Sequence, residues 1–124
     1  MNSKLKEKEE VRRDQPSKLS SETLNMGKVK KLYSMMFEIY GRVQGVYFRK
    51  HTQIKAKELG LYGWCMNTKD GTVKGIVEGP VDLISEMRIW LQHKGSPRSI
   101  IEKAVFTSNE PISAYNFSKF TIKR

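Results

Sequence analysis

The stretch YGRVQGVYFRKH, Tyr40–His51, decides the fold because the chain changes there from one hydrophobic period to another. Before and into it, apolar residues recur at every second position, which predicts a half-buried strand. They are Met35, Phe37, Ile39 and Val43. From Phe48 onward the apolar side has helical spacing, which predicts a helix ended by Gly60. The stretch is therefore a strand-to-helix connection.

Further elements follow in a regular order. Strands are expected from about 61 to 67 and from 72 to 78, joined by a hairpin at Asp70-Gly71, where both central turn positions favour positive φ. A helix begins at Pro80 and ends at Gly95. Its apolar stripe is Leu83, Ile84, Met87 and Leu91. Two more strands are expected near 102–107 and 117–123, the second of them a short strand near the end of the chain.

This order predicts an α+β fold, the ferredoxin-like α/β sandwich, with an antiparallel sheet of four to five strands and two helices on one face. Residues 1–32 have no sustained apolar period and are rich in Lys, Glu, Ser and Arg. We expect them to form a basic, disordered N-terminal extension because they cannot bury enough apolar surface to offset ordering. The domain then covers residues 33–124.

Composition limits the classes of function. The 124 residues include 23 basic and 13 acidic side chains, a net charge of +10 that favours anionic partners. No apolar run approaches the roughly 18 residues of a membrane span, and no apolar signal core is present, so we expect a cytoplasmic protein. Its size suggests a monomer. With one cysteine, Cys65, and two histidines, His51 and His93, neither a metal centre nor another cofactor is expected.

The loop GRVQGV can expose backbone N–H groups beside the start of a helix, which is a favourable environment for an anion. Gly41 and Gly45 permit backbone angles and close approach that other residues hinder, and Arg49 has the planar fork that suits phosphate oxygens. The same features also fit an ordinary turn and a solvated arginine. Asn67, at the mouth of the hairpin, fits a turn former better than a residue that holds water. The residues alone leave these alternatives open.

Two longer motifs carry a resemblance to a known family. GRVQGVYFR followed by GLYGWCMNTKDGTVKGIVEGP strongly resembles the acylphosphatases, in the order and at the spacing of that family. The resemblance extends from about Phe37 to the end of the chain. It implies a ferredoxin-like sandwich and a metal-free hydrolase of carboxyl–phosphate anhydrides.

The resemblance also implies roles for individual residues. Arg49 matches the phosphate-binding arginine of the family, and Asn67 matches the asparagine that orients the attacking water. The amide cradle of the family matches Arg42, Val43, Gln44, Gly45 and Val46. The implied substrates are acyl phosphates such as carbamoyl phosphate, 1,3-bisphosphoglycerate and aspartyl phosphates on proteins, with inorganic phosphate as a product.

Two positions depart from the family. The chain ends in Lys123-Arg124 where the family often ends in tyrosine, with its terminal carboxylate near the catalytic arginine. The extra positive charge is expected to weaken that contact and to lower the order of the site. Tyr47 occupies a position that we take to be variable, where its bulk narrows access.

Two rival functions remain at this stage. A basic ferredoxin-like domain could bind RNA, but no segment supplies the glycine and aromatic pattern of that class of module, so nucleic-acid binding is not expected. A non-catalytic anion-binding domain is the other rival, and the presence of both Arg49 and Asn67 argues against it.

Overall fold

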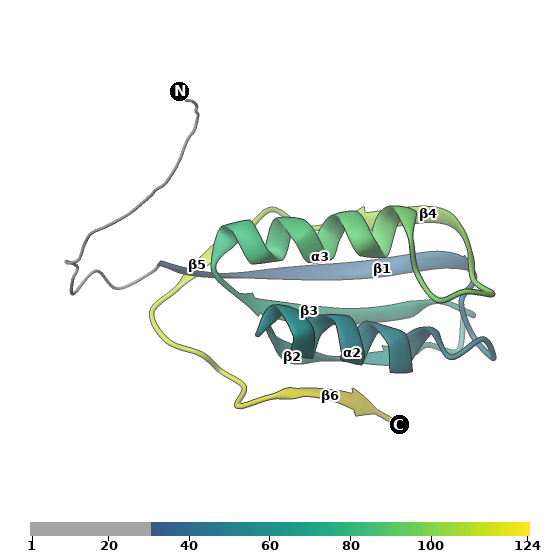
Figure 1. The fold of residues 1–124 in the computed structure, drawn as a ribbon, viewed down its shortest axis with the longest axis horizontal. Coiled ribbons are helices and arrows are strands. Elements are labelled where there is room, and N and C mark those ends of the chain that lie inside the picture. The colour runs from purple at the N-terminus through teal and green to yellow at the C-terminus, as the bar shows by residue number, and fades with distance from the viewer. Residues whose placement is uncertain (1–30) are drawn as a thin grey trace. The chain divides into compact units, whose positions relative to one another are not determined.

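Residues 31–124, the part of the chain that the computed structural model describes, form a sheet with two helices on one of its faces (Figure 1). The strands are β1 (Leu32–Arg42), β2 (Tyr62–Asn67), β3 (Val73–Gly79), β4 (Ile100–Phe106), β5 (Glu110–Ile112) and β6 (Phe120–Lys123). The helices are α2 (Phe48–Leu59) and α3 (Val81–His93). The predicted order of strands and helices is confirmed. The predicted extension lies almost entirely outside the described residues and stays a prediction.

The sheet has the strand order β4-β1-β3-β2-β6, and the short β5 also pairs with β1. The predicted ferredoxin-like sandwich is confirmed, but the sheet is mixed and has six strands. β6 runs parallel to β2, from the pair Gly63–Phe120 to the pair Met66–Lys123, whereas every other pair is antiparallel. The difference arises because β5 ends beside the start of β1, and the chain passes along that same end of the sheet before β6 begins.

The core lies between the sheet and the two helices. The predicted apolar stripes are buried there, with Phe48, Thr52 and Ala56 contributed by α2 and Ile84, Met87 and Leu91 contributed by α3. Thr52 is polar, but its hydroxyl donates to the Phe48 carbonyl at 2.7 Å, which satisfies it inside the helix. None of the helices within residues 31–124 is long and apolar enough to cross a membrane.

The hairpin between β2 and β3 differs from its prediction in its turn. The Thr68 N–H donates to the Thr72 carbonyl at 2.9 Å, and the Gly71 N–H donates to the Thr68 carbonyl at 3.2 Å. Gly71 has φ +88°, whereas Asp70 does not adopt positive φ. The loop therefore has three residues and ends in a left-handed glycine, so the expectation of positive φ at both central positions was wrong.

A buried carboxylate fixes the segment that leads into β6. Glu78 of β3 is fully buried, and its two oxygens accept hydrogen bonds from the Asn116 N–H at 2.8 Å, the Asn116 side-chain amide at 2.7 Å and the Phe117 N–H at 3.3 Å. A buried charge is tolerated when several donors satisfy it. Glu78 therefore sets where β6 begins.

Replacing Glu78 by alanine should destabilise the domain, because three donors would lose a charged acceptor. We expect the free energy of unfolding in urea to fall by about 3 kcal/mol. The matched control is Glu86→Ala on the exposed side of α3, which should change it by less than about 0.5 kcal/mol. Equal stability of the two variants would contradict the anchoring role.

Candidate active site

The loop between β1 and α2 is held by its side chains. Val43 is buried, and Val46 packs partly against the core. The side-chain amide of Gln44 donates to the carbonyls of Thr68 and Thr72 at 2.8 and 2.9 Å. These contacts direct the side chains of Val43, Gln44 and Val46 into the domain or toward the hairpin.

The backbone amides of this loop have no hydrogen-bond acceptor among the described residues. The first helical hydrogen bond of α2 runs from the His51 N–H to the Tyr47 carbonyl at 3.0 Å. The eight preceding amides, of residues 43–50, donate no hydrogen bond to any residue within 31–124. Their position at the start of a helix adds the positive end of the helix dipole. Free N–H groups at a helix N-terminus favour an anion. Val43 and Phe48 are buried, so the candidate donors are the amides of residues 44–47, 49 and 50.

The two glycines of the stretch have different roles. Gly45 has φ +77° and open space where a Cβ would stand, so its left-handed conformation is what favours glycine there. Gly41 has φ +125° at a β-bulge in β1, and a Cβ there would clash with the Ile100 carbonyl oxygen. Gly45 therefore shapes the loop, whereas Gly41 allows β1 and β4 to approach each other.

Arg49 lies in the first turn of α2 and faces a hollow of about 550 Å³. The hollow is lined by Gly45, Tyr47, Arg49, Lys50, Ile122 and Arg124. Figure 1 shows why residues so distant in sequence meet, because β6 ends at the same end of the domain where α2 begins. Tyr47 is strongly exposed and adopts φ +60°, a conformation that costs a non-glycine residue about 1 kcal/mol or more.

Asn67 ends β2 and lies near the same turn of α2. The Cys65 thiol is 3.9 Å from the Arg49 carbonyl oxygen, so the start of α2 packs over Cys65. Alternate residues of a strand share a face, which puts Asn67 on the same side as Cys65, about 7 Å farther along β2. The Asn67 Oδ1 atom is buried and has no hydrogen-bond partner within residues 31–124. Asn67 is not among the residues that line the hollow.

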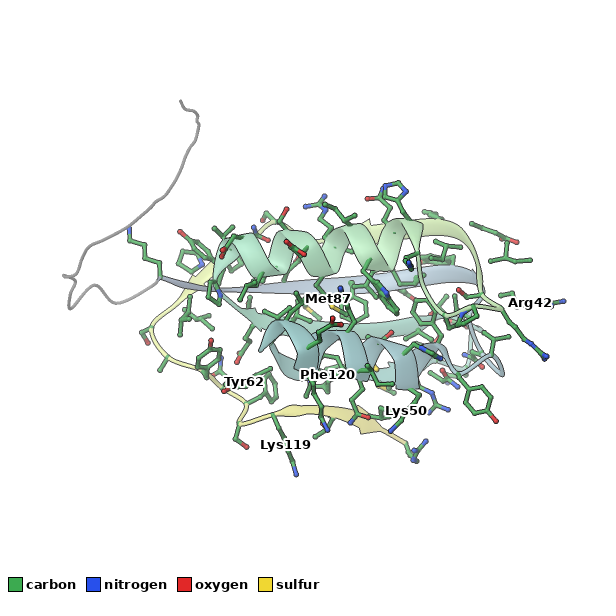
Figure 2. All side chains as sticks on the ribbon, viewed as in Figure 1. Arg42, Lys50, Tyr62, Met87, Lys119 and Phe120 are labelled. Carbon is green, nitrogen blue, oxygen red and sulfur yellow. The ribbon has the colours of Figure 1, made fainter. Side chains whose placement is uncertain are left out.

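Arg42 differs from the other predicted members of the cradle. It belongs to β1, and its backbone pairs with Ile100 of β4. Its side chain is exposed and projects from the end of the domain (Figure 2). Phosphate binding by Arg42 stays a prediction, and the free amides begin one residue later.

Cys65 is a packing residue of the core. It is fully buried, and this burial raises the pKa of its thiol to about 12, although the nearby positive charge of Arg49 acts in the opposite direction. A thiol that stays protonated at neutral pH is a poor nucleophile. No group of three or more His, Cys, Asp or Glu side chains within residues 31–124 is arranged to hold a metal ion.

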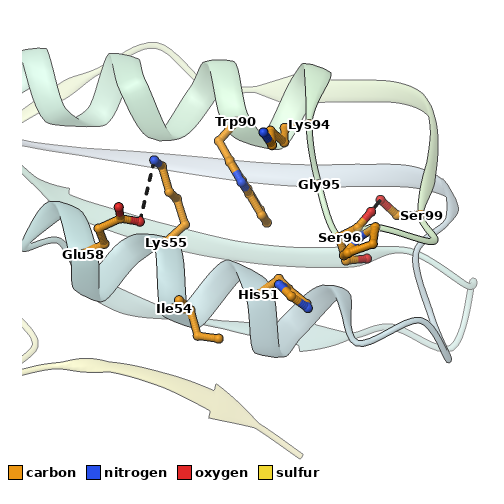
Figure 3. A pocket seen from close by; sticks show the side chains of 10 residues that line it. His51, Ile54, Lys55, Glu58, Trp90, Lys94, Gly95, Ser96 and Ser99 are labelled. Carbon is orange, nitrogen blue, oxygen red and sulfur yellow. Dashed lines mark hydrogen bonds and ion pairs between the residues drawn. The ribbon is translucent and has the colours of Figure 1, made fainter.

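A second hollow, of about 620 Å³, lies between α2 and the segment that follows α3 (Figure 3). Its lining includes His51, Trp90 and Lys94, together with Lys55 and Glu58, which form an ion pair at 3.7 Å. It contains neither Arg49 nor any of the loop residues 42–46. The hollow at Arg49, although somewhat smaller, contains two predicted site residues, Gly45 and Arg49. The other five predicted residues do not line it.

Comparison with known proteins agrees with this geometry. A model of the family Acylphosphatase matches residues 35–122, most of the described domain. The chain belongs to the acylphosphatase family. It is 48% identical over 91 residues to human Acylphosphatase-1, which covers 73% of this chain and 92% of that protein. It is 50% identical over 92 residues to Acylphosphatase-1 of Drosophila melanogaster, covering 74% and 77% of the two chains.

A solved acylphosphatase has the same fold. The crystal structure of acylphosphatase from Bacillus subtilis superposes with a TM-score of 0.68 and 30% sequence identity, covering 74% of this chain and 99% of that one. This acylphosphatase fold includes β6, whose end reaches the hollow at Arg49. The family resemblance had linked the end of the chain to the site, but Lys50 and Ile122 were not identified as lining residues. The parallel pairing of β6 with β2 brings Ile122 and Arg124 to the loop.

Loss of the Gln44 side chain should loosen the loop, because nothing else described in the chain ties it by hydrogen bonds to the hairpin. We expect Gln44→Ala to bind inorganic phosphate about tenfold more weakly in isothermal titration calorimetry. Gln92→Ala, an exposed glutamine of α3, is the matched control and should bind phosphate like the unmodified chain. Unchanged binding by a folded Gln44→Ala variant would show that the amides are held without this clamp.

Proposed function

We propose that residues 33–124 form an acylphosphatase domain in which the loop and Arg49 hold the phosphoryl group while Asn67 orients the attacking water. The reaction is hydrolysis of the carboxyl–phosphate bond of acyl phosphates to a carboxylate and inorganic phosphate. The observation that carries the proposal is the run of eight free amides beside Arg49 in a member of the acylphosphatase family.

Binding uses the backbone first. The amides of Val43, Gln44, Gly45 and Val46, together with Arg42 as predicted, surround the phosphoryl oxygens. The guanidinium of Arg49 adds two parallel donors and a full positive charge. Because the loop is fixed by the buried Val43, the partly buried Val46 and Gln44, its donors need little reorganisation when the substrate enters.

The chemical step is a transfer of the phosphoryl group to water. The water oxygen forms a bond to phosphorus while the bond between phosphorus and the carboxyl oxygen breaks, and the carboxylate leaves with the electron pair. Negative charge is spread over the equatorial oxygens in this transition state, so positioned donors supply most of the catalysis. The Asn67 carboxamide, whose Oδ1 lacks a described partner, accepts a hydrogen bond from the water and aligns it.

Proton transfer needs no protein base in this scheme. The residues that line the hollow include no carboxylate and no histidine. The proton of the water therefore passes to an oxygen of the phosphoryl group, which leaves as inorganic phosphate. The carboxylate is a good leaving group, so it requires no acid.

The remaining expectations form part of the same proposal. The chain acts without a metal or another cofactor, as a cytoplasmic monomer that does not bind nucleic acid. Residues 1–32 form a basic extension that is dispensable for hydrolysis. Benzoyl phosphate turnover in the presence of EDTA, with and without residues 1–32, tests whether hydrolysis requires a metal or the extension.

Replacement of Arg49 should abolish most of the activity. We expect Arg49→Gln to lower kcat for benzoyl phosphate by about 10²- to 10³-fold, because one transition-state donor is lost, and to raise the inhibition constant of inorganic phosphate. Asn67→Ala should lower kcat by a similar factor and leave that inhibition constant nearly unchanged, because Asn67 contacts water and not phosphate.

The matched control is Lys57→Gln, which removes one positive charge from an exposed position of the same helix. It should keep normal turnover, and circular dichroism should show all three variants folded. Near-normal turnover of folded Arg49→Gln would refute the role of Arg49. Loss of activity of the unmodified chain on EDTA treatment would refute the metal-free mechanism.

A further inference from the structure

The hollow at Arg49 carries more positive charge than a phosphoryl group requires. Its ionisable cations are Arg49, Lys50 and Arg124, and no acidic residue is among its lining. Within residues 31–124 the ion pair between Lys55 and Glu58 is the sole pair within 4.0 Å, so none of the three cations is neutralised by a described carboxylate. A phosphoryl group bound by Arg49 and the loop amides leaves Lys50 and Arg124 without an acidic side chain as partner among residues 31–124.

The hollow also has room beyond the phosphoryl group. Its volume of about 550 Å³ is in the range of pockets that hold whole small molecules. Ile122 provides an apolar wall, and the exposed ring of Tyr47 provides a planar one. An acyl group can therefore lie between these walls, with its far end near the two remaining cations.

Strand register determines which of the two terminal cations faces the hollow. Ile122 pairs with the buried Cys65, so Ile122 and Arg124 share the side of the sheet that carries the helices. Lys123 points to the opposite side, where its Nζ atom lies 4.2 Å from the centre of the Trp64 ring. The last pair of this ladder joins Met66 and Lys123, so Arg124 and Asn67 each follow a paired residue at the same end of the sheet.

Lys50 reaches the same region from the first turn of α2. Its side chain is exposed and lies at the end of the helix that adjoins the end of β6 (Figure 2). Lys50 and Arg124 thus approach the hollow from two different elements, and a carboxylate or phosphate between them would meet two charged donors.

We propose that this hollow selects acyl phosphates whose acyl group carries a second anionic group, with Arg124 and Lys50 as the specificity-determining residues. The inference rests on the proposed function, because it concerns the acyl end of the substrate in the same site. Arg49 and the loop bind the reacting phosphoryl group, and Arg124 and Lys50 bind the second anion. The second anion adds affinity without taking part in the bond that breaks.

Matched synthetic substrates test the proposal. Benzoyl phosphate has a neutral acyl group, and 4-carboxybenzoyl phosphate and 4-phosphonobenzoyl phosphate add a carboxylate or a phosphonate to the same ring. The full chain should show a higher kcat/KM for both anionic substrates than for benzoyl phosphate. Comparison of the carboxylate with the phosphonate shows which anion the two cations prefer.

Variants of the cationic residues then show which side chains cause the preference for anionic substrates. Arg124→Gln should reduce the ratio of kcat/KM for anionic to neutral substrates about fivefold, and Lys50→Gln should reduce it about threefold, mainly through KM. Lys123→Gln is the matched control, because it removes an adjacent charge on the other face, and it should leave the ratio unchanged. High salt should also lower the ratio of the unmodified chain, because exposed charge pairs are screened.

The outcomes separate this inference from the function on which it rests. The inference alone would be overturned if hydrolysis of benzoyl phosphate depends on Arg49 but Arg124→Gln and the unmodified chain have the same ratio of kcat/KM for anionic to neutral substrates. A larger loss in Lys123→Gln than in Arg124→Gln would overturn the assignment of faces. Failure of the unmodified chain to hydrolyse any of the three substrates would overturn both proposals.

Discussion

The side-chain amide of Gln44 makes the contact on which the site depends most. It donates to two carbonyls of the hairpin, those of Thr68 and Thr72, across 24 and 28 residues of sequence. One of those carbonyls belongs to the residue directly after Asn67. The loop that offers the amides and the strand end that offers the carboxamide are thus fixed to each other by a single side chain. The buried Val43 and the partly buried Val46 on either side of Gln44 hold the loop against the core.

Much of the fold could be predicted because local patterns and tertiary structure agree. The spacing of Phe48, Thr52 and Ala56 specified the buried face of α2, and Gly60 ended that helix in the left-handed conformation expected of it. The parallel pairing of β6 could not be predicted from alternation, which is the same for parallel and antiparallel strands. The burial of Glu78 could not be predicted either, because its hydrogen-bond donors lie 38 and 39 residues farther along the chain.

The site was predictable to a different extent at each residue. Glycines and an arginine beside the start of a helix are compatible with an anion-binding site, but ordinary turns share those features. The family motifs were needed to choose between the binding site and the turn. The sequence could not show that residues 43–50 all keep free amides, because this depends on which partners the fold leaves within reach. The position of Arg124 in the lining of the hollow could not be derived from the residues alone either, since it depends on the register between β2 and β6.

The central claim is that phosphate binds to the backbone between β1 and α2, and amide chemical shifts report on this directly. Titration of the ¹⁵N-labelled chain with inorganic phosphate should shift the amide signals of residues 43–50 most strongly. Gly45 should be among the most affected, and residues around the hollow at Trp90 and Lys94 should change little. The largest shifts at Trp90 and Lys94, or none in residues 43–50 at saturating phosphate, would contradict the account.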